Sequence, residues 1–140
     1  MTLLGQTRGE HENTEKEILF VKLDNLARIK CKERDGWRCR RCGATWNLEW
    51  SHIMVRKYLN TRWDLKNCFT LCDKCHEWWH ANPIESAEWA KILMGEDLYY
   101  ENMRRAHEPP AMSIENMQRL YEHLKSLTFK NGSRRLPETG

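Results

Sequence analysis

Residues 39–43 read Cys-Arg-Arg-Cys-Gly, and residues 72–75 read Cys-Asp-Lys-Cys, in a chain of 140 residues. Two residues between two cysteines allow both thiolates of a pair to turn toward one cation. Two such pairs supply the four soft ligands of a tetrahedral zinc site. Gly43 follows the first pair, where a tight turn needs a permissive backbone. We therefore predict a structural zinc ion bound by Cys39, Cys42, Cys72 and Cys75.

Disulfide bonds are the alternative use of these cysteines. Residues 1–13 are polar and lack the apolar core of a secretory signal peptide. The cytosol keeps thiols reduced, so we favour metal binding and expect a cytoplasmic protein. The other two cysteines, Cys31 and Cys68, have no partner at metal-ligand spacing, and we expect both to be small buried apolar residues.

The composition is that of a soluble globular chain, with 31% charged and 40% hydrophobic residues. No apolar run is long enough to span a membrane. The net charge of +3 is unevenly spread, because residues 22–66 hold twelve Lys or Arg against five Asp or Glu, whereas both flanks are acidic. This basic centre fits a partner with a phosphate backbone. A solvated charged face is the alternative interpretation.

The local patterns predict a small α+β core. Residues 14–17 read Thr-Glu-Lys-Glu, a capping box, and apolar residues at helical spacing then predict a helix over residues 15–32. Residues 37–41 and 48–53 are short and predict the two strands of a hairpin. Residues 60–66 are polar and loop-like. A helix over residues 73–81, ended by Asn82-Pro83, completes a strand, strand and helix arrangement around a metal.

The C-terminal third predicts three helices. Residues 84–94 and 96–106 form the first two, and Ser113 can cap a third along residues 114–127. The chain thus divides into a flexible N-terminus (1–13), a core with its N-terminal helix (14–82), a helical extension packed on the core (83–128) and a flexible tail (129–140). Residues 136–140 spell LPETG, a sortase recognition motif. No hydrophobic anchor follows it, and we interpret it as a tag or a coincidence.

A closed four-cysteine zinc site has no open coordination position, so it cannot activate water. Any catalytic group must lie elsewhere, and the segment between the cysteine pairs contains His52 and Asn67. His76 and His80 follow the second pair and lie four residues apart, on one face of the predicted helix. Two imidazoles on one helical face can hold one metal ion. The alternative is that one of them caps the helix or packs.

Together these residues resemble the HNH endonuclease family. The segments 35–43 (DGWRCRRCG), 51–53 (SHI), 64–67 (DLKN) and 71–76 (LCDKCH) follow the family's order and spacing. The stretch over residues 51–83 is similar to HNH proteins of bacteriophages and prophages, and the resemblance extends over about residues 14–127. It implies a ββα-metal, or His-Me finger, core. It also implies hydrolysis of DNA phosphodiester bonds by water with one divalent cation, as a nick or a double-strand cut of low sequence specificity.

The resemblance also implies roles for single residues. His52 matches the general base, and His76 and His80 match helix histidines that bind the cation. Asn67 matches the middle letter of the motif, which is either a metal ligand or an amide that fixes the loop positioning the base. Ser51 stands where many members place an acidic or histidine ligand. Because a hydroxyl is a poorer ligand, the cation stays open between Mg²⁺ or Mn²⁺, which prefer oxygen, and Zn²⁺ or Ni²⁺, which suit histidine.

Substrate contacts are expected from basic residues in or beside the motif loops: Arg38, Arg40, Arg41, Arg56, Lys57, Arg62 and Lys66. The seven tryptophans are expected mainly to pack the core, with Trp63 kept as a candidate DNA contact. The alternative function is a non-catalytic zinc module that binds nucleic acid or a protein. The resemblance suggests phage packaging proteins such as terminase or portal as partners, and we expect a monomer or weak dimer.

Overall fold

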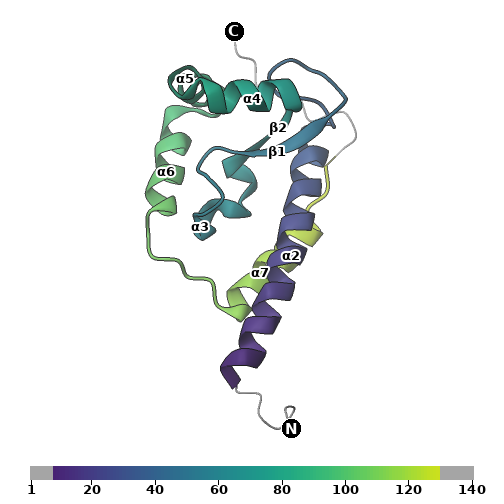
Figure 1. Ribbon diagram of the computed structural model, residues 1–140, viewed down its shortest axis with the longest axis vertical. Helices are drawn as coiled ribbons and strands as arrows, with labels where there is room; N and C mark the ends of the chain where they lie inside the picture. Colours follow the sequence, from purple (N-terminus) through teal and green to yellow (C-terminus); the bar gives the residue numbers. More distant parts are fainter. Residues whose placement is uncertain (1–7, 130–140) are drawn as a thin grey trace.

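The computed structural model describes residues 8–129, and its fold is α+β, with mostly helices and one two-stranded antiparallel sheet (Figure 1). The elements are α2 (Arg8–Arg34), β1 (Leu48–His52), α3 (Leu59–Arg62), the 3₁₀ helix η1 (Leu65–Asn67), β2 (Cys68–Cys72), α4 (Asp73–Ala81), α5 (Pro83–Met94), α6 (Glu96–Ala106) and α7 (Ile114–Ser126). The helices predicted over residues 73–81, 84–94 and 96–106 are confirmed to within a residue. The third C-terminal helix is also confirmed, with the Ser113 hydroxyl accepting the Asn116 N–H at its start.

The sheet pairs β1 with β2, with Leu48 opposite Cys72 and His52 opposite Cys68. The hairpin predicted between residues 37–41 and 48–53 is therefore wrong. Residues 37–41 form no strand, because their backbone folds around the first cysteine pair. The Cys39 N–H donates to the Ala44 carbonyl at 2.8 Å. It therefore bonds within the loop and not to a neighbouring strand. β1 instead pairs with β2, which follows it in the chain after residues 53–67.

α2 is longer than predicted and begins at Arg8, so the capping box at residues 14–17 does not mark its start. Residues 8–13, predicted to be flexible, are helical. The helix ends with Gly36 in the left-handed region (φ 66°). The N–H groups of Gly36 and Trp37 donate back to the Glu33 and Lys32 carbonyls, which is the pattern of a Schellman motif.

The segment at residues 60–66, predicted as a loop, contains most of α3 and the start of η1. Asp64 caps η1 by accepting the Lys66 N–H at 2.9 Å. The short helices turn the chain inward between the strands, so that Thr61, Trp63 and Asn67 are buried. Predicted flexible residues 1–7, and residues 130–140 with the LPETG motif, lie outside the described residues.

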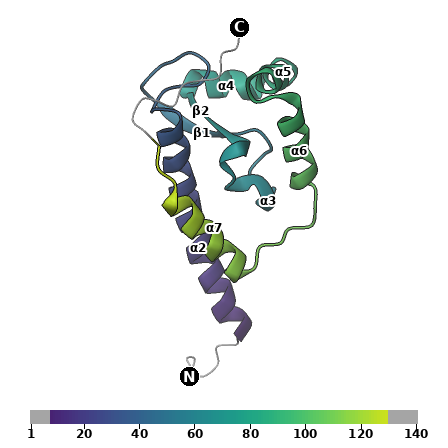
Figure 2. The same cartoon turned by 180° about the vertical axis from the view of Figure 1, so that it is seen from behind.

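Helices cover both sides of the sheet. α2 and α7 lie side by side along one side, whereas α4, α5 and α6 follow one another around the other (Figures 1 and 2). One core cluster joins α4, α5 and α6 to the strands through Phe69, Leu71 and Leu93. A second joins α2, α3 and α7 through Leu23, Trp63 and Leu124. Within residues 8–129 no helix has the length and apolar character needed to cross a membrane.

Candidate functional site

The four cysteines of the two pairs meet between the loop that follows α2 and the start of α4. Their sulfur atoms all lie within 4.8 Å of one another, and the Sγ atoms of Cys42 and Cys72 are 3.7 Å apart. A tetrahedral zinc ion with ordinary Zn–S bonds requires sulfur atoms about 3.8 Å apart. The cluster of Cys39, Cys42, Cys72 and Cys75 could therefore hold a metal ion such as zinc, as the spacing predicts.

Backbone N–H groups turn toward the sulfurs in both pairs. The N–H groups of Arg41 and Cys42 point at Cys39 Sγ, and that of Cys75 points at Cys72 Sγ, each at 3.4 Å. Burial alone would raise the pKa of the Cys39 thiol, but these donors lower it to about 7. The donors of the first turn thus stabilise the thiolate form of Cys39, which is the form that binds a metal, whereas burial raises the pKa of Cys75 to about 12.

The predicted histidine pair is brought together on α4. The Nε2 atoms of His76 and His80 are 3.2 Å apart, and Glu49 Oε1 of β1 lies 2.7 Å from His76 Nδ1. A carboxylate only accepts, so the proton of His76 sits on Nδ1 and its Nε2 lone pair faces His80. Two nitrogen ligands of one tetrahedral zinc ion would lie about 3.4 Å apart. The contact is a hydrogen bond from the Nε2–H of His80 to the Nε2 of His76, and its length is also close to the separation of two ligands of one cation.

Glu49 belongs to none of the sequence motifs. Carboxylates that hold the far nitrogen of a metal-binding histidine are a recurring arrangement, because they fix both its tautomer and its ring orientation. Glu49 precedes Ser51 by two residues and so lies on the same face of β1. That alternation was the signal available in the sequence. The sequence predicts a helix over residues 73–81, but not that this helix lies against the same face of β1.

A solvent-facing hollow of about 570 Å³ adjoins the histidine pair, lined by Glu49, Asp73, His76, Glu77, His80 and Ala81. Asp73 and Glu77 are exposed, so they add two carboxylates at its rim. Neither His52 nor Asn67 lines it. The hollow is thus lined by two histidines and three carboxylates, but among the described residues only the four cysteines form a group of three or more such side chains close enough to hold a metal ion.

His52 lies at the end of β1, on the sheet face opposite Glu49, since successive strand residues alternate. Its ring packs on Trp50 with centroids 4.2 Å apart, and Nε2 lies 3.0 Å from the Arg62 carbonyl oxygen. A carbonyl only accepts, so Nε2 carries the proton and Nδ1 keeps its lone pair. Burial lowers the pKa of His52 to about 4, which leaves the ring neutral at neutral pH.

Asn67 is fully buried, and its amide ties together two loop segments. Oδ1 accepts the Met54 N–H at 2.8 Å, and Nδ2 donates to the carbonyls of Met54 and Thr61 at 2.9 and 3.1 Å. Ser51, the residue before His52, is also buried and lies on the sheet face of Glu49. The structure therefore brings His76 and His80 together, but places His52 and Asn67 in a separate region around the loop after β1.

Two of the seven basic residues expected to contact DNA are committed to ion pairs. Arg40 lies 2.8 Å from the buried Asp35 carboxylate, and Arg62 donates to both oxygens of Asp24 at 2.8 and 2.7 Å. The other five are exposed: Arg38, Arg41, Arg56, Lys57 and Lys66.

Trp63, kept as a candidate DNA contact, is only 1% exposed, so that interpretation is wrong. Its Nε1–H donates to Asp24 at 2.7 Å, and its ring packs edge-on against Phe20. The reason is that α3 turns this residue toward α2, where the carboxylate of Asp24 satisfies the indole N–H. A polar loop, as predicted, would have left it at the surface.

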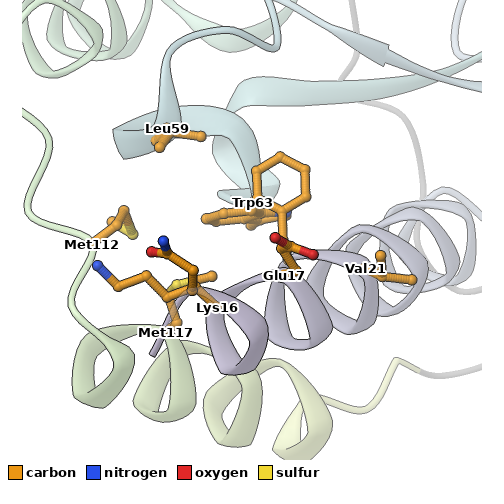
Figure 3. A pocket seen from close by; sticks show the side chains of 9 residues that line it. Lys16, Glu17, Val21, Leu59, Trp63, Met112 and Met117 are labelled. Atoms are coloured by element: carbon orange, nitrogen blue, oxygen red, sulfur yellow. The ribbon is translucent and has the colours of Figure 1, made fainter. Parts of the chain in front are cut away.

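A groove of about 540 Å³ lies between α2, α3 and the start of α7. Figure 3 shows Leu59 and Trp63 facing Met112 and Met117 across it, with Lys16 and Glu17 at its side. Most of its lining is apolar, and it brings no histidine or cysteine together. It has no group suited to acid–base or metal chemistry beyond one lysine and one glutamate, so we do not regard it as a catalytic site.

Acid is expected to weaken the fold through His52. Its pKa of about 4 in the folded chain lies below the ordinary 6.5, so between these pH values only the unfolded chain takes up the proton. The free energy of unfolding should fall by about 3 kcal/mol as pH drops through this window, with no contribution above it. Urea unfolding of wild type and His52→Gln measures this effect, and the stability advantage of the wild type should shrink with acid. A pH-independent difference would contradict the prediction.

Comparison of the chain with protein-family models, with curated proteins and with solved structures found no match.

Proposed function

We propose that this protein is a metal-dependent endonuclease of the HNH type that hydrolyses phosphodiester bonds of DNA. In this proposal β1, β2 and α4 form the ββα-metal core, and the four cysteines hold a structural zinc ion. The observation that carries the proposal is the histidine pair on α4, whose Nε2 atoms converge to 3.2 Å beside a carboxylate that orients one of them. The order of the motifs along the chain supports the same assignment.

His76 and His80 would hold the catalytic cation, which supplies Lewis acidity toward a scissile phosphate when bound. Glu49 keeps His76 in the tautomer with an unprotonated Nε2. The nitrogen donors suit Zn²⁺ or Ni²⁺, and the carboxylates of Asp73 and Glu77 at the rim suit Mn²⁺ or Mg²⁺. In this proposal the acidic residues around the hollow would take the place of the ligand missing at Ser51.

His52 is proposed as the general base, accepting a proton from the attacking water at Nδ1. The Arg62 carbonyl leaves that nitrogen unprotonated, and Asn67 holds the loop that follows His52. Exposed arginines and lysines of the same segment, such as Arg56 and Lys57, supply phosphate contacts. Since His52 and the histidine pair lie on opposite faces of the sheet, the two assignments need separate tests.

The second candidate function is a non-catalytic zinc module that binds nucleic acid. The separation of His52 and Asn67 from the hollow beside His76 favours it, because such a module needs no converging catalytic set. It shares the closed cysteine site and the basic surface with the nuclease. Cleavage activity and its dependence on single histidines distinguish the two functions.

Cleavage of supercoiled plasmid with Mg²⁺, Mn²⁺, Zn²⁺ or Ni²⁺ tests the proposal. We expect His52→Ala to lower the rate by about 10²-fold or more, as is typical for loss of a general base, with cation affinity unchanged. His76→Ala should lower both rate and cation affinity. His123→Ala, an exposed histidine on α7, is the matched control and should cleave like wild type.

The outcomes separate the assignments. Loss of cleavage in His76→Ala with full activity in His52→Ala would keep the metal centre and overturn the general base. Equal cleavage by all variants, or none by the wild type with any of the four cations, would reject the nuclease and favour the zinc module. Zinc content of each variant should stay at wild-type level, since the cysteine cluster is untouched.

A further inference from the structure

Two of the seven tryptophans remain at the surface. Trp37 is 49% exposed and Trp46 is 65% exposed. Among the described residues neither packs on another ring or on a cation. The other five all make such contacts: Trp50, Trp63, Trp78, Trp79 and Trp89. Two large exposed indole rings close together in the sequence are candidates for contact with a partner, because amphipathic aromatic rings are enriched where a surface meets one.

Both exposed tryptophans belong to the loop of residues 37–47, which we term the knuckle loop. Its backbone is held in unusual conformations, with Trp37 at φ 55° and Asn47 at φ 51°. These are the two non-glycine residues with positive φ in the part of the chain that the structure describes. A bulky side chain in this region is strained, and such strain concentrates at functional positions.

The knuckle loop is also rigidly anchored. Its first cysteine pair belongs to the four-cysteine cluster, and its far end is bound to α4 because the Asp73 N–H donates to the Asn47 carbonyl at 2.9 Å. Trp37 follows the helix-ending glycine at a position where an apolar residue commonly packs back on the helix, yet it stays half exposed. The loop therefore presents its rings on a fixed frame, at little further entropic cost on binding.

The charge of the knuckle loop is wholly positive. It contains Arg38, Arg40 and Arg41 and no acidic residue. Arg40 is spent on the buried Asp35, but Arg38 is exposed and forms no ion pair among the described residues. Arg41 is exposed; its guanidinium carbon lies 3.7 Å from the centroid of the Trp78 ring, and one of its N–H groups donates to Cys75 Sγ at 3.5 Å. The surface thus combines exposed indole rings with exposed cations.

We propose that the knuckle loop binds an unpaired stretch of a DNA strand, with bases stacked on Trp46 and Trp37 and phosphates against Arg38 and Arg41. Exposed aromatic rings beside cations are the combination that single-stranded nucleic acid requires, because every base has a face to stack. A duplex already stacks its bases internally and offers the loop only phosphates. This inference rests on the proposed function, and it narrows the substrate to DNA with unpaired nucleotides.

Fluorescence anisotropy with labelled oligothymidylate, and with a duplex of equal length, tests the inference without any added catalytic cation. Trp46→Ala should bind oligothymidylate about tenfold more weakly, the loss expected for one base stack, and bind the duplex like wild type. Trp46→Phe keeps a ring and should recover part of the affinity. Ile84→Ala removes a side chain that is 77% exposed on α5 and is the matched control, with no expected effect.

Salt dependence separates stacking from charge. Arg38→Gln should reduce the slope of log affinity against log salt by about 0.7 for the single strand, the value for one lost phosphate contact. Trp46→Ala should keep the wild-type slope while lowering affinity at every salt concentration. Zinc content of both variants shows whether the cysteine cluster is intact, so that an unfolded loop is not mistaken for a lost contact.

The inference is overturned if Trp46→Ala and Trp37→Ala, with zinc retained, bind oligothymidylate like wild type, or if each loses duplex affinity to the same extent. That failure is distinct from a failure of the nuclease. A protein that cleaves plasmid but ignores both tryptophans retains the proposed function alone. A protein that cleaves nothing but depends on Trp46 for single strands retains the interface alone.

Discussion

Replacing Cys72 with alanine is expected to unfold the region around the sheet and α4. Cys72 ends β2, and its sulfur accepts the Cys75 N–H at the start of α4, so it joins the four-cysteine cluster to both elements. A structural zinc ion contributes on the order of 10–16 kcal/mol in small zinc-binding domains. Loss of one of four ligands removes much of that contribution. A whole domain is stable by only about 5–15 kcal/mol, so the fold should not survive the loss.

Zinc stoichiometry, far-UV circular dichroism and thermal unfolding measure this effect. A strong chelator added to wild type should reproduce the result for Cys72→Ala. Cys31→Ala is the matched control, because Cys31 is fully buried yet lies outside the four-cysteine cluster. It should keep the metal and lose about 1 kcal/mol, as is common for a single substitution. Full zinc content and an unchanged melting temperature in Cys72→Ala would refute the structural metal site.

Replacing Asp35 with alanine is expected to have the second largest effect. Asp35 is 2% exposed at the end of α2, and its carboxylate accepts from Arg34 at 2.9 and 3.0 Å and from Arg40 at 2.8 Å. It also accepts the Thr70 N–H of β2 at 2.9 Å. Alanine would leave two guanidinium groups and a strand N–H without their shared acceptor. Breaking such a buried ion pair from one side costs about 3–5 kcal/mol.

Urea unfolding measures the loss in the free energy of unfolding, for Asp35→Ala and for a control variant. Glu122→Ala removes one partner of an exposed ion pair with Lys125, and it should change stability by less than about 1 kcal/mol. Asp35→Asn keeps the shape of the side chain but halves its acceptor capacity and removes its charge. Its loss of stability should therefore lie between those of Asp35→Ala and Glu122→Ala. A loss below 1 kcal/mol in Asp35→Ala would show that Arg34 and Arg40 find other acceptors, and that the cluster does not join α2 to the sheet.

Local sequence signals predicted most of the helices and the cysteine cluster. The spacing of Cys39, Cys42, Cys72 and Cys75 depends only on turns of a few residues, and the structure brings their sulfurs within 4.8 Å of one another. Ser113 and the Asn82-Pro83 pair are likewise local signals. α7 begins directly after Ser113, and α4 ends directly before Asn82. Signals of this kind predict the structure well because they depend only on residues close together in the chain.

The sequence patterns did not predict contacts between segments that lie far apart in the chain. The strand partner of residues 48–52 is β2, a segment whose apolar run is buried on both faces and so lacks the alternation that marks a half-buried strand. The length of α2 was underestimated because the capping box at residues 14–17 imitates a helix start inside a longer helix. The polar neighbours of Trp63 in the sequence make it a candidate DNA contact, yet α3 turns it inward.

By itself the sequence determined the cysteine cluster, the histidine pair on one helical face and the basic centre, since each follows from the spacing or type of residues near one another in the chain. Only the tertiary structure decided which of those residues act together. It paired β1 with β2, placed Glu49 beside His76, and set His52 on the opposite face with its Nε2 on the Arg62 carbonyl. The physical reason is that strand register and helix packing are set by the burial of apolar side chains from distant segments, which no local pattern encodes.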